Sequence, residues 1–534
     1  MRLMLVQMAS RVGDLEGNRE RIVAALAHAE EAGCDLAVFP ELAVTGYPPE
    51  DLLLRPAFMD AVENEVARLV AATGKVAAVF GCPRRVDGSL RNSAVLAAGG
   101  DILGIYDKRA LPNYGVFDER RYFEPGTSDH DVFTYRGWHI GIGICEDLWH
   151  DDLAGKSMAF GCDVRVNLNA SPFHVGKQDE REALIRRRAA QFGVPVAYVN
   201  PVGGQDEVVF DGGSHAMDPS GVLLGRSPLF EQAELIVDLD RPGQADVAPM
   251  PERMAQVYDA LVLGIRDYVL RNGCRQVLLG LSGGIDSAVT AALAVDALGA
   301  ENVLGVLMPS RYSSGHSIRD AEALATNLGI DTVTLPIEAP VDATETLLAP
   351  VFASWGRSQP DATEENIQAR IRGLLQMAIS NKTGRMLLTT GNKSEMAVGY
   401  ATLYGDMAGG FAVLKDVYKT EVYELAHWLN RGQERIPVNS ITKEPSAELR
   451  EDQRDADSLP PYPVLDAILT ATIEERQSVE QIAARGFPVE EVRRIVRMVH
   501  AAEYKRRQAP PGVKITPRAF GRDRRYPITH AFRE

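Results

Sequence analysis

Basic residues are scarce in this chain relative to acidic ones. It holds 57 lysines and arginines against 73 aspartates and glutamates, which gives a formal net charge of −16 at pH 7. An acidic chain of this kind is poorly suited to bind the phosphate backbone of a nucleic acid or an anionic membrane surface. We therefore expect neither nucleic acid nor a membrane among its partners.

Cysteines and long apolar runs are also lacking. Only five cysteines occur in 534 residues, widely spaced and without a CxxC pair. This argues against a disulfide framework and a structural zinc site, and it fits a reducing compartment. We see no window of about 18 uncharged apolar residues that would predict a transmembrane helix. The first ten residues do not follow the layout of a signal peptide, so we expect a cytoplasmic protein.

What the chain does contain is two sets of short apolar runs, separated by a segment rich in proline and glycine at 241–253. The apolar runs alternate with helical patterns, which we place at 18–32, 56–72, 286–298, 317–328 and 364–381. This alternation predicts an α/β fold with buried strands, and a parallel sheet in the second half. We expect domains at 1–240 and 256–534, joined by a linker at 241–255.

Three apolar runs of the first half each end at a reactive side chain. DLAVFP ends at Glu41, ILGIYD ends at Lys108, and HIGIGI ends at Cys145. Sites in α/β folds assemble at the carboxyl ends of strands, so we expect these side chains to meet. Glu41 is placed to take the proton of a Cys145 thiol that attacks an amide, and Lys108 to stabilise the oxyanion.

A histidine is the alternative base, as in Cys-His amidotransferases. The nearest candidates in the sequence are His139 and His150, beside the strand that ends at Cys145, and His174 lies further on. We rank them below Glu41 because none of them stands at a strand end before a turn.

The stretches FPELAVTGYPPED, YDKRALPNYGVFDERRYFEPG and GICEDLW resemble the carbon–nitrogen hydrolase (nitrilase) family, in order, across residues 1–240. The resemblance implies an α-β-β-α sandwich with Glu41 as base, Lys108 as the oxyanion-supporting cation and Cys145 as nucleophile. It also implies that Glu119 positions the substrate. In the members that use glutamine, the positions that hold glutamine match Tyr114, Ser171 and Lys177.

In the second half, the run LLGL leads into SGGIDS at 282–287, before a helical pattern. Backbone N–H groups and hydroxyls at a helix N-terminus bind anions, which predicts a phosphate loop. The lysine of a Walker A loop is missing, so transfer of a γ-phosphoryl group is not indicated. Asp286 would repel phosphate unless a cation lay between them, so it predicts Mg²⁺.

A second strand, RMLLTT, leads into GNKSE at 391–395. Here Glu395 is a candidate second Mg²⁺ ligand, and Thr390 is placed to contact a nucleotide. The alternative is a plain helix cap built by Ser394 and Glu395.

SGGIDS resembles the pyrophosphate loop of the N-type ATP pyrophosphatases, and with TTGNKSE, LKDVYKTEVYELA and PRAFGRDRRYP it resembles NAD synthetase from about residue 256. The resemblance implies a Rossmann-like domain with a parallel sheet. It places ATP on Gly280, Leu281, Ser282, Gly283, Gly284, Ile285, Asp286, Ser287, Thr390 and Lys419. It places Mg²⁺ on Asp286 and Glu395, and deamido-NAD on Asn366, Glu395 and Lys505.

Together the two halves resemble the glutamine-dependent NAD synthetase family, whose members are carbon–nitrogen ligases. The resemblance implies L-glutamine, ATP and deamido-NAD as substrates, an acyl-adenylate, and release of AMP and pyrophosphate. We expect a channel that carries ammonia between the two sites, and a homo-oligomer built on synthetase-domain dimers. The charged segment within 436–462 is either a lid over the substrates or a solvated loop. The basic stretch 503–534 is either a solvated tail or an arm that reaches an anionic ligand.

Three other functions stay open. One is a related ligase with another acceptor, such as a xanthine nucleotide, because such enzymes share SGGIDS. The second is a nitrilase-like half that acts only as a scaffold, although Glu41, Lys108 and Cys145 are all present. The third is an amidase fused to a nucleotide-binding module with no shared chemistry.

Overall fold

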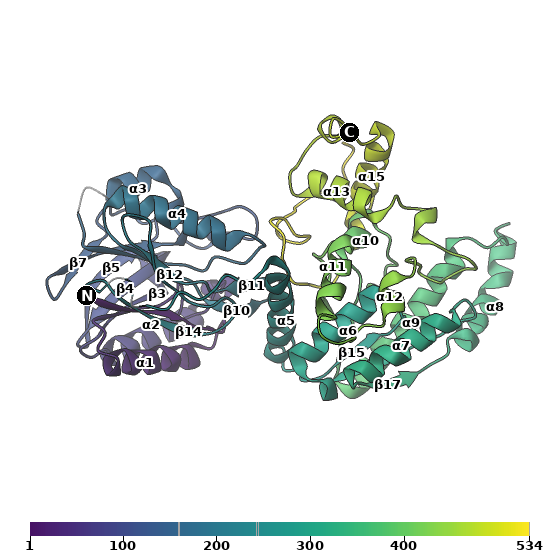
Figure 1. The fold of residues 1–534 in the computed structure, drawn as a ribbon, viewed down its shortest axis with the longest axis horizontal. Coiled ribbons are helices and arrows are strands. Elements are labelled where there is room, and N and C mark those ends of the chain that lie inside the picture. The colour runs from purple at the N-terminus through teal and green to yellow at the C-terminus, as the bar shows by residue number, and fades with distance from the viewer. Residues whose placement is uncertain (158–160, 242, 244, 533–534) are drawn as a thin grey trace. The chain divides into compact units, whose positions relative to one another are not determined.

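The computed structural model describes residues 1–157, 161–241, 243 and 245–532. The chain forms two compact units, Met1–Gln256 and Val257–Glu534 (Figure 1). The helix α5 (Arg253–Arg271) begins at Arg253, so the last three positions of the predicted linker are helical.

The first unit contains two six-stranded sheets. The first sheet has the order β14 (Ala233–Asp238), β1 (Arg2–Gln7), β2 (Leu36–Val38), β3 (Ala77–Val86), β4 (Ser89–Ala98) and β5 (Asp101–Asp107). The second sheet has the order β13 (Leu223–Arg226), β12 (His215–Met217), β9 (Val196–Val199), β8 (Val164–Leu168), β7 (Trp138–Ile144) and β6 (Val132–Tyr135). A small hairpin of β10 (Val202–Gln205) and β11 (Val208–Asp211) accompanies them.

The two sheets pack face to face, and helices cover their outer faces. Along β1, Leu3 and Leu5 lie in the core shared with the second sheet, whereas Met4 and Val6 pack with residues of α1 (Leu15–Glu31) and α2 (Pro56–Ala71). Successive side chains of a strand point to opposite faces, so a continuous apolar run suits a sheet covered on both sides. The helix α4 (Lys177–Phe192) packs on the second sheet. Figure 1 shows the four layers, which confirm the predicted α-β-β-α sandwich.

The strand directions explain how distant residues reach one edge of the first sheet. β2 and β3 are parallel, β4 reverses direction, and β5 reverses it again. β5 therefore runs parallel to β2, and the residues that follow these strands, Glu41 and Lys108 among them, lie at the same edge.

The second unit is built on a five-stranded parallel sheet. Its order is β17 (Asp331–Thr334), β16 (Val303–Leu307), β15 (Val277–Gly280), β18 (Met386–Thr389) and β19 (Phe411–Ala412). The chain starts at β15, builds outward to β17 and then crosses to β18 on the other side. This reversal puts a topological switch point beside the carboxyl end of β15, where α/β sheets bind ligands.

Helices surround this sheet and extend beyond it. The predicted helices are found as α6 (Ile285–Leu298), α7 (Gly315–Leu328) and α9 (Ala362–Thr383), each within two residues of its predicted start and end, whereas α8 (Glu338–Ser354) was not predicted. A separate apolar cluster joins α10 (Lys393–Val398) to α13 (Tyr462–Ile473), α14 (Val479–Ala483) and α15 (Val489–Ala501). The remaining helices of this region are α11 (Lys419–Leu429), α12 (Val438–Thr442) and α16 (Glu503–Arg506).

The basic C-terminal stretch packs against this helical cluster. Arg506 is buried and donates hydrogen bonds to the carbonyls of Met396 and Ala397 at 3.2 and 2.6 Å. Arg524 is buried and pairs with Glu503 at 2.5 Å. These contacts contradict a wholly solvated tail, because its cations bind residues of α10 and α16.

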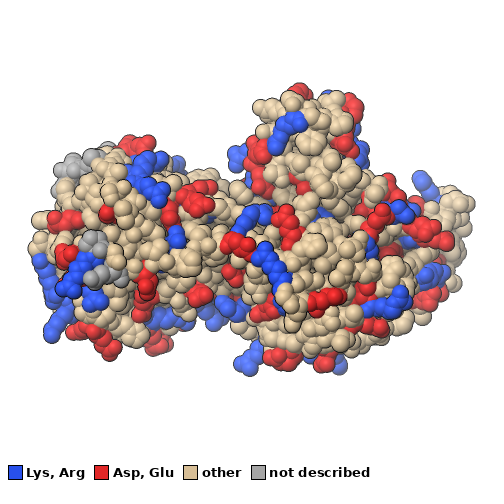
Figure 2. Space-filling model, in the orientation of Figure 1, with Lys and Arg blue, Asp and Glu red and all other residues tan. Residues whose placement is uncertain are grey.

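Within the described ranges, no helix combines the length and the apolar character needed to cross a membrane. On the face shown in Figure 2, lysines and arginines are interspersed with aspartates and glutamates over both units.

Candidate active sites

Lys108 lies at the centre of a buried cluster of charges in the first unit. Its Nζ donates to Glu41 Oε1 at 2.7 Å and to both carboxylate oxygens of Glu119 at 2.8 Å. The side chains of all three residues are at most 4% exposed. Because this ammonium and its two carboxylates are shielded from water, the electrostatic interactions among the three charges are stronger than they would be at the surface.

The two carboxylates and the lysine adjust one another's charge. Burial opposes the charge of Lys108, but Glu119 and Glu41 together raise its pKa well above the usual value. Burial raises the pKa of Glu119 to about 7, although the Lys108 ammonium pulls it down. Lys108 is therefore a fixed cation, whereas Glu119 titrates near neutral pH.

Cys145 is the first residue of a short 3₁₀ turn, η3 (Cys145–Trp149), directly after β7. Its φ of 43° lies in the left-handed region, which costs a non-glycine residue about 1–3 kcal/mol and is often found at active sites. Burial raises the pKa of its thiol, as does the charge of Glu41, while Lys108 opposes the shift. The thiol is thus neutral at rest and needs a base to form the thiolate.

The hydrogen bonds of the candidate histidines favour Glu41 as that base. His139 pairs with Asp163 at 3.2 Å, and His174 Nδ1 lies 3.0 Å from the carbonyl of Val175. His150 lies 3.6 Å from Glu146, the residue after Cys145. Glu41, by contrast, contacts Lys108 and acts electrostatically on Cys145.

Of the three residues predicted to hold glutamine, Tyr114 and Lys177 contact the turn that begins at Cys145, and Ser171 contacts α4. The Tyr114 hydroxyl donates to Glu146 at 3.0 Å, and the Lys177 ammonium lies 4.4 Å from the centroid of the Trp149 ring. Ser171 is buried, and its Oγ accepts a hydrogen bond from Arg181 Nε at 3.2 Å. The Tyr114 side chain is 59% exposed, so it lies on the open side of the turn.

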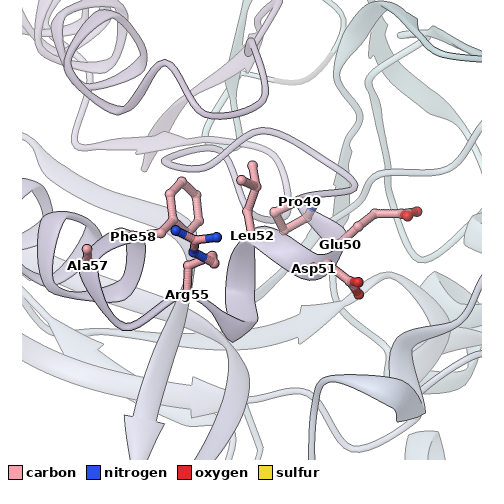
Figure 3. A pocket seen from close by; sticks show the side chains of 7 residues that line it. All are labelled: Pro49, Glu50, Asp51, Leu52, Arg55, Ala57 and Phe58. Atoms are coloured by element: carbon pink, nitrogen blue, oxygen red, sulfur yellow. The ribbon is translucent and has the colours of Figure 1, made fainter.

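Sequence reasoning missed two further residues of this cluster. Asn92 donates to Glu41 Oε1 at 2.7 Å, and the Tyr47 hydroxyl donates to Glu119 Oε1 at 3.0 Å. Tyr47 stands in the stretch that carries the nitrilase resemblance, whereas nothing around Asn92 in the sequence marks it. A surface pocket lies elsewhere, beside the short 3₁₀ turn η1 (Glu50–Leu54), and holds none of the predicted site residues (Figure 3).

In the second unit the loop SGGIDS joins β15 to α6. Its hydroxyls brace it: the Oγ atoms of Ser282 and Ser287 lie 3.1 Å apart, and the Gly284 N–H donates to Ser282 Oγ at 3.2 Å. Gly283 has a φ of +76°, and a Cβ there would lie 2.2 Å from the carbonyl oxygen of Ser317. Only glycine lets the loop pass this close to the start of α7.

Asp286, Lys419 and Glu395 form an ion-pair group beside this loop. Lys419 Nζ donates to Asp286 Oδ2 and lies 3.4 Å from Glu395 Oε1. Asn392 Nδ2 donates to Asp286 Oδ1 at 2.9 Å, which connects the SGGIDS and GNKSE loops. Burial raises the pKa of Glu395 to about 8, against the pull of the Lys419 ammonium.

The donor set of this group fits a divalent cation. Two carboxylates face one lysine, and hard oxygen donors are what Mg²⁺ prefers. Among the residues that the structure describes there is no cluster of three or more histidine, cysteine or acidic side chains that could hold a metal. Two carboxylates are enough where substrate phosphates supply the other ligands, which is the usual mode of Mg²⁺ in nucleotide sites.

The other predicted residues of this half lie in two places. Gly280 ends β15 and Thr390 follows β18, both at the switch point. Asn366 Oδ1 accepts from Thr402 Oγ1 at 2.9 Å, and Lys505 Nζ donates to the carbonyls of Gly399 and Ala401 at 2.7 Å. Asn366 and Lys505 thus both contact the segment 399–402, which follows α10.

The helix cap that was the alternative prediction for Ser394 and Glu395 is present, with Asn392 as the capping residue. Glu395 therefore takes part both in the helix cap and in the ion-pair group.

The charged segment predicted as a lid or a solvated loop is anchored to α7. Glu448 accepts hydrogen bonds from the hydroxyls of Ser314 and Ser317, both at 2.8 Å. Further along, Gln368 donates to the carbonyl of Leu449 at 2.9 Å. The segment therefore lies over the helices next to the SGGIDS loop.

Both halves match known family models. The carbon–nitrogen hydrolase model matches residues 2–248, and the NAD synthase model matches residues 257–509. The fold and the two sites thus define a nitrilase-like hydrolase joined to an NAD synthase domain.

Curated relatives match the whole chain. The glutamine-dependent NAD(+) synthetase of Thermotoga maritima is 46% identical, over 100% of this chain and 99% of its own. That of Synechocystis is 47% identical, over 99% and 98%. The solved glutamine-dependent NAD+ synthetase of Acinetobacter baumannii, in complex with adenosine diphosphate, is 43% identical with a TM-score of 0.80 and covers 99% of this chain and 98% of its own. This chain belongs to the family of glutamine-dependent NAD(+) synthetases.

Proposed function

We propose that this protein makes NAD from deamido-NAD, with ATP as co-substrate and the amide of L-glutamine as the nitrogen source. The observation that supports this best is the pairing of two different sites on one chain. The first unit holds the Glu41–Lys108–Cys145 cluster, which is suited to amide hydrolysis. The second holds SGGIDS beside Asp286, Lys419 and Glu395, which is suited to breaking a nucleotide between its α- and β-phosphates.

The first step is the release of ammonia. Within the described part of the chain, Glu41 Oε2 is buried without a hydrogen-bond partner, so it is free to take the Cys145 proton. The Cys145 sulfur then attacks the glutamine carboxamide, and Lys108 stabilises the negative oxygen that forms. Glu41 returns the proton to the nitrogen, the C–N bond breaks, and ammonia leaves behind a thioester. Water activated by Glu41 hydrolyses the thioester to glutamate.

Glu119 and the glutamine-binding residues prepare this step. The two bonds from Lys108 to Glu119 fix the direction of the ammonium, so that its third proton faces Glu41. Tyr114, Ser171 and Lys177 bind glutamine around the turn at Cys145, where a basic side chain at Lys177 suits a carboxylate substrate.

The second step joins the nitrogen to the acceptor. The carboxylate of deamido-NAD attacks the α-phosphorus of ATP, and pyrophosphate leaves as a unit held by the N–H groups and hydroxyls of residues 280–287. Mg²⁺ bound by Asp286 and Glu395 would neutralise the phosphate charge. Lys419 contributes a further positive charge, and Thr390 contacts the nucleotide. Ammonia then attacks the acyl carbon, the bond to AMP breaks, and the carboxamide of NAD forms.

The acceptor is bound by Asn366, Glu395 and Lys505 around the segment 399–402. The anchored segment at 436–462 closes over it and excludes water from the acyl-adenylate, which water would otherwise hydrolyse. A channel inside the protein carries ammonia, since free ammonia in neutral water is mostly protonated and unreactive.

A second copy of the chain is the remaining partner. Leu347, Val351 and Trp355 follow one another at helical spacing along α8 and at its end, and their exposed fractions are 74%, 39% and 68%. An apolar stripe of this kind is typical of a surface that another subunit covers. We therefore place the dimer contact of the synthetase domains on α8.

Product analysis tests this function. The protein is supplied with glutamine, ATP, Mg²⁺ and deamido-NAD, and the products are separated by chromatography. Glutamate, AMP, pyrophosphate and NAD are expected in equal amounts. The formation of ADP and phosphate would reject adenylation. Turnover with a xanthine nucleotide, together with no turnover with deamido-NAD, would reject deamido-NAD as the acceptor.

A further inference from the structure

Asp147, two residues after Cys145, makes four hydrogen bonds from a buried position. Its Oδ2 accepts from the backbone N–H of Ile144 at 3.0 Å and from the hydroxyl of Tyr106 at 2.8 Å. Its Oδ1 accepts from the backbone N–H groups of Arg109 and Ala110 at 3.1 and 2.8 Å. The residue is 4% exposed.

These four bonds join the segments that carry two of the reacting side chains. Ile144 precedes Cys145, whereas Arg109 and Ala110 follow Lys108 directly. One carboxylate therefore links the turn of the nucleophile in the second sheet to the segment of the cation in the first sheet. The bond to Ile144 also closes the turn in which Cys145 adopts its left-handed φ of 43°.

We propose that Asp147 is a positioning residue for the ammonia-releasing reaction: it fixes the Cys145 sulfur relative to the Lys108 ammonium by bonding the backbone on each side. The inference rests on the proposed function of this site and assigns Asp147 a role that it exerts through the backbone of neighbouring residues. Three of its four donors are backbone N–H groups, so the geometry depends mainly on residue 147 and to a smaller extent on the Tyr106 side chain.

The test compares Asp147→Asn with the unchanged protein. An asparagine keeps the volume, but it cannot accept on both sides, because its NH₂ group would face the N–H of Ile144. We expect kcat for ammonia release from glutamine to fall by about 100-fold, the size of effect that a misplacement near 1 Å produces, with little change in KM. The pH midpoint for alkylation of Cys145 by iodoacetamide, followed by mass spectrometry of its peptide, should rise because Lys108 would no longer stabilise the thiolate.

Two further variants separate positioning from stability. Glu65 is the control: its carboxylate is buried in α2 of the same unit and pairs with Arg19 at 2.6 Å and with Arg68 at 3.0 Å. Glu65→Gln should lower the melting temperature without moving the alkylation midpoint. Tyr106→Phe removes one of the four bonds while leaving the backbone contacts, and it should move the midpoint in the same direction by a smaller amount.

An unchanged kcat and midpoint in Asp147→Asn would overturn the proposal. Equal shifts in Glu65→Gln would also overturn it, because any buried carboxylate would then have the same effect. Should Asp147→Asn fail to fold, the absence of a shift in Tyr106→Phe would count against it. If the unchanged protein releases no ammonia from glutamine, the proposed function fails, but the alkylation midpoints still decide the role of Asp147.

Discussion

Two carboxylates share one lysine in the first unit, and their hydrogen bonds differ. Glu41 keeps one oxygen without a partner, whereas Glu119 gives both of its oxygens to Lys108 and its pKa lies near 7 because of burial. We therefore propose different roles for the two residues: Glu41 exchanges protons, and Glu119 sets the orientation of Lys108 once it is ionised.

This division predicts how activity depends on pH. Below a pH of about 7 Glu119 is protonated and holds Lys108 less firmly. Ammonia release from glutamine should therefore rise as the pH passes through about 7, and Glu119→Gln should lose this rise and stay at the lower rate. The Cys145 thiol does not account for the rise, since its own pKa is shifted well above the usual value. Rates measured across this range in both proteins check the prediction.

The same shift has an effect on stability. A carboxyl with a raised pKa in the folded state holds its proton after the unfolded chain has released it, so stability falls as the pH rises from 4.5 to about 7. Urea unfolding at the two ends of this range should show a smaller fall in Glu119→Gln. An equal fall in both proteins would assign the pH dependence to another group.

At the scale of elements, the continuous apolar runs were good predictors. DLAVFP contains β2, and ILGIYD and HIGIGI match all but the first residue of β5 and β7, because a strand buried on both faces leaves an unbroken apolar signal. The helix α8 was missed, since Pro340 and Pro350 interrupt its pattern and only one of its residues is buried. Strands β12 and β13 have three and four residues, too few for a periodicity to appear.

The residues of the candidate sites likewise include some that could be predicted from the sequence and some that could not. Glu41, Lys108 and Cys145 follow strong strands, so their positions could be inferred from where those strands end. The partners Asn92 and Asp147 act through contacts between segments far apart in the chain, at separations of 51 and 38 residues. No local pattern encodes such a contact, and only the packed sheets bring the groups together.

The loop after β15 allows a sharp test of one element. Gly283→Ala should abolish synthesis of NAD, because the new Cβ would lie 2.2 Å from a carbonyl oxygen of α7 and the loop could no longer hold pyrophosphate. Ammonia release from glutamine should persist, since it takes place in the first unit.

Gly329 is the matched control for that variant. It ends α7 with a φ of +68°, but nothing lies within 4 Å of a Cβ placed there. Gly329→Ala should cost about 1 kcal/mol of stability through its backbone conformation and leave synthesis intact. If Gly283→Ala and Gly329→Ala lose NAD synthesis equally, the loss results from backbone strain and not from the lack of space at the loop.

At the scale of the whole molecule, the two reactions should be separable by substitution. Cys145→Ala should lose synthesis driven by glutamine and retain synthesis driven by added ammonium, because only the nitrogen source is removed. Asp286→Ala should fail with both donors, because the ion-pair group with Lys419 and Glu395 is broken. Formation of NAD is the measurement, and failure of ammonium to support Cys145→Ala would show that the sites do not work independently.

The apolar stripe on α8 predicts the state of assembly. Burial of a large apolar side chain contributes about 1.5–3 kcal/mol, so a charge placed in the stripe should weaken a dimer strongly. Leu347→Glu should lower the mass measured by size-exclusion chromatography with light scattering. Val222, which is 57% exposed in the first unit, provides the control: Val222→Glu should leave the mass unchanged. An unchanged mass in Leu347→Glu would place the contact elsewhere.

The contacts of the C-terminal stretch can form only at the end of the protein's synthesis. Lys393, within the GNKSE loop, donates to Thr516 Oγ1 at 2.7 Å and to the carbonyl of Arg518 at 3.2 Å. Asp416 accepts from the backbone N–H groups of Ile515 and Thr516, both at 2.8 Å. While the ribosome still encloses these last residues, the nucleotide site lacks its support, although the first unit has long left the tunnel. We therefore expect a chain that stops shortly before position 515 to lose NAD synthesis, because Lys393 and Asp416 would lose these contacts, while the contacts within its first unit stay the same.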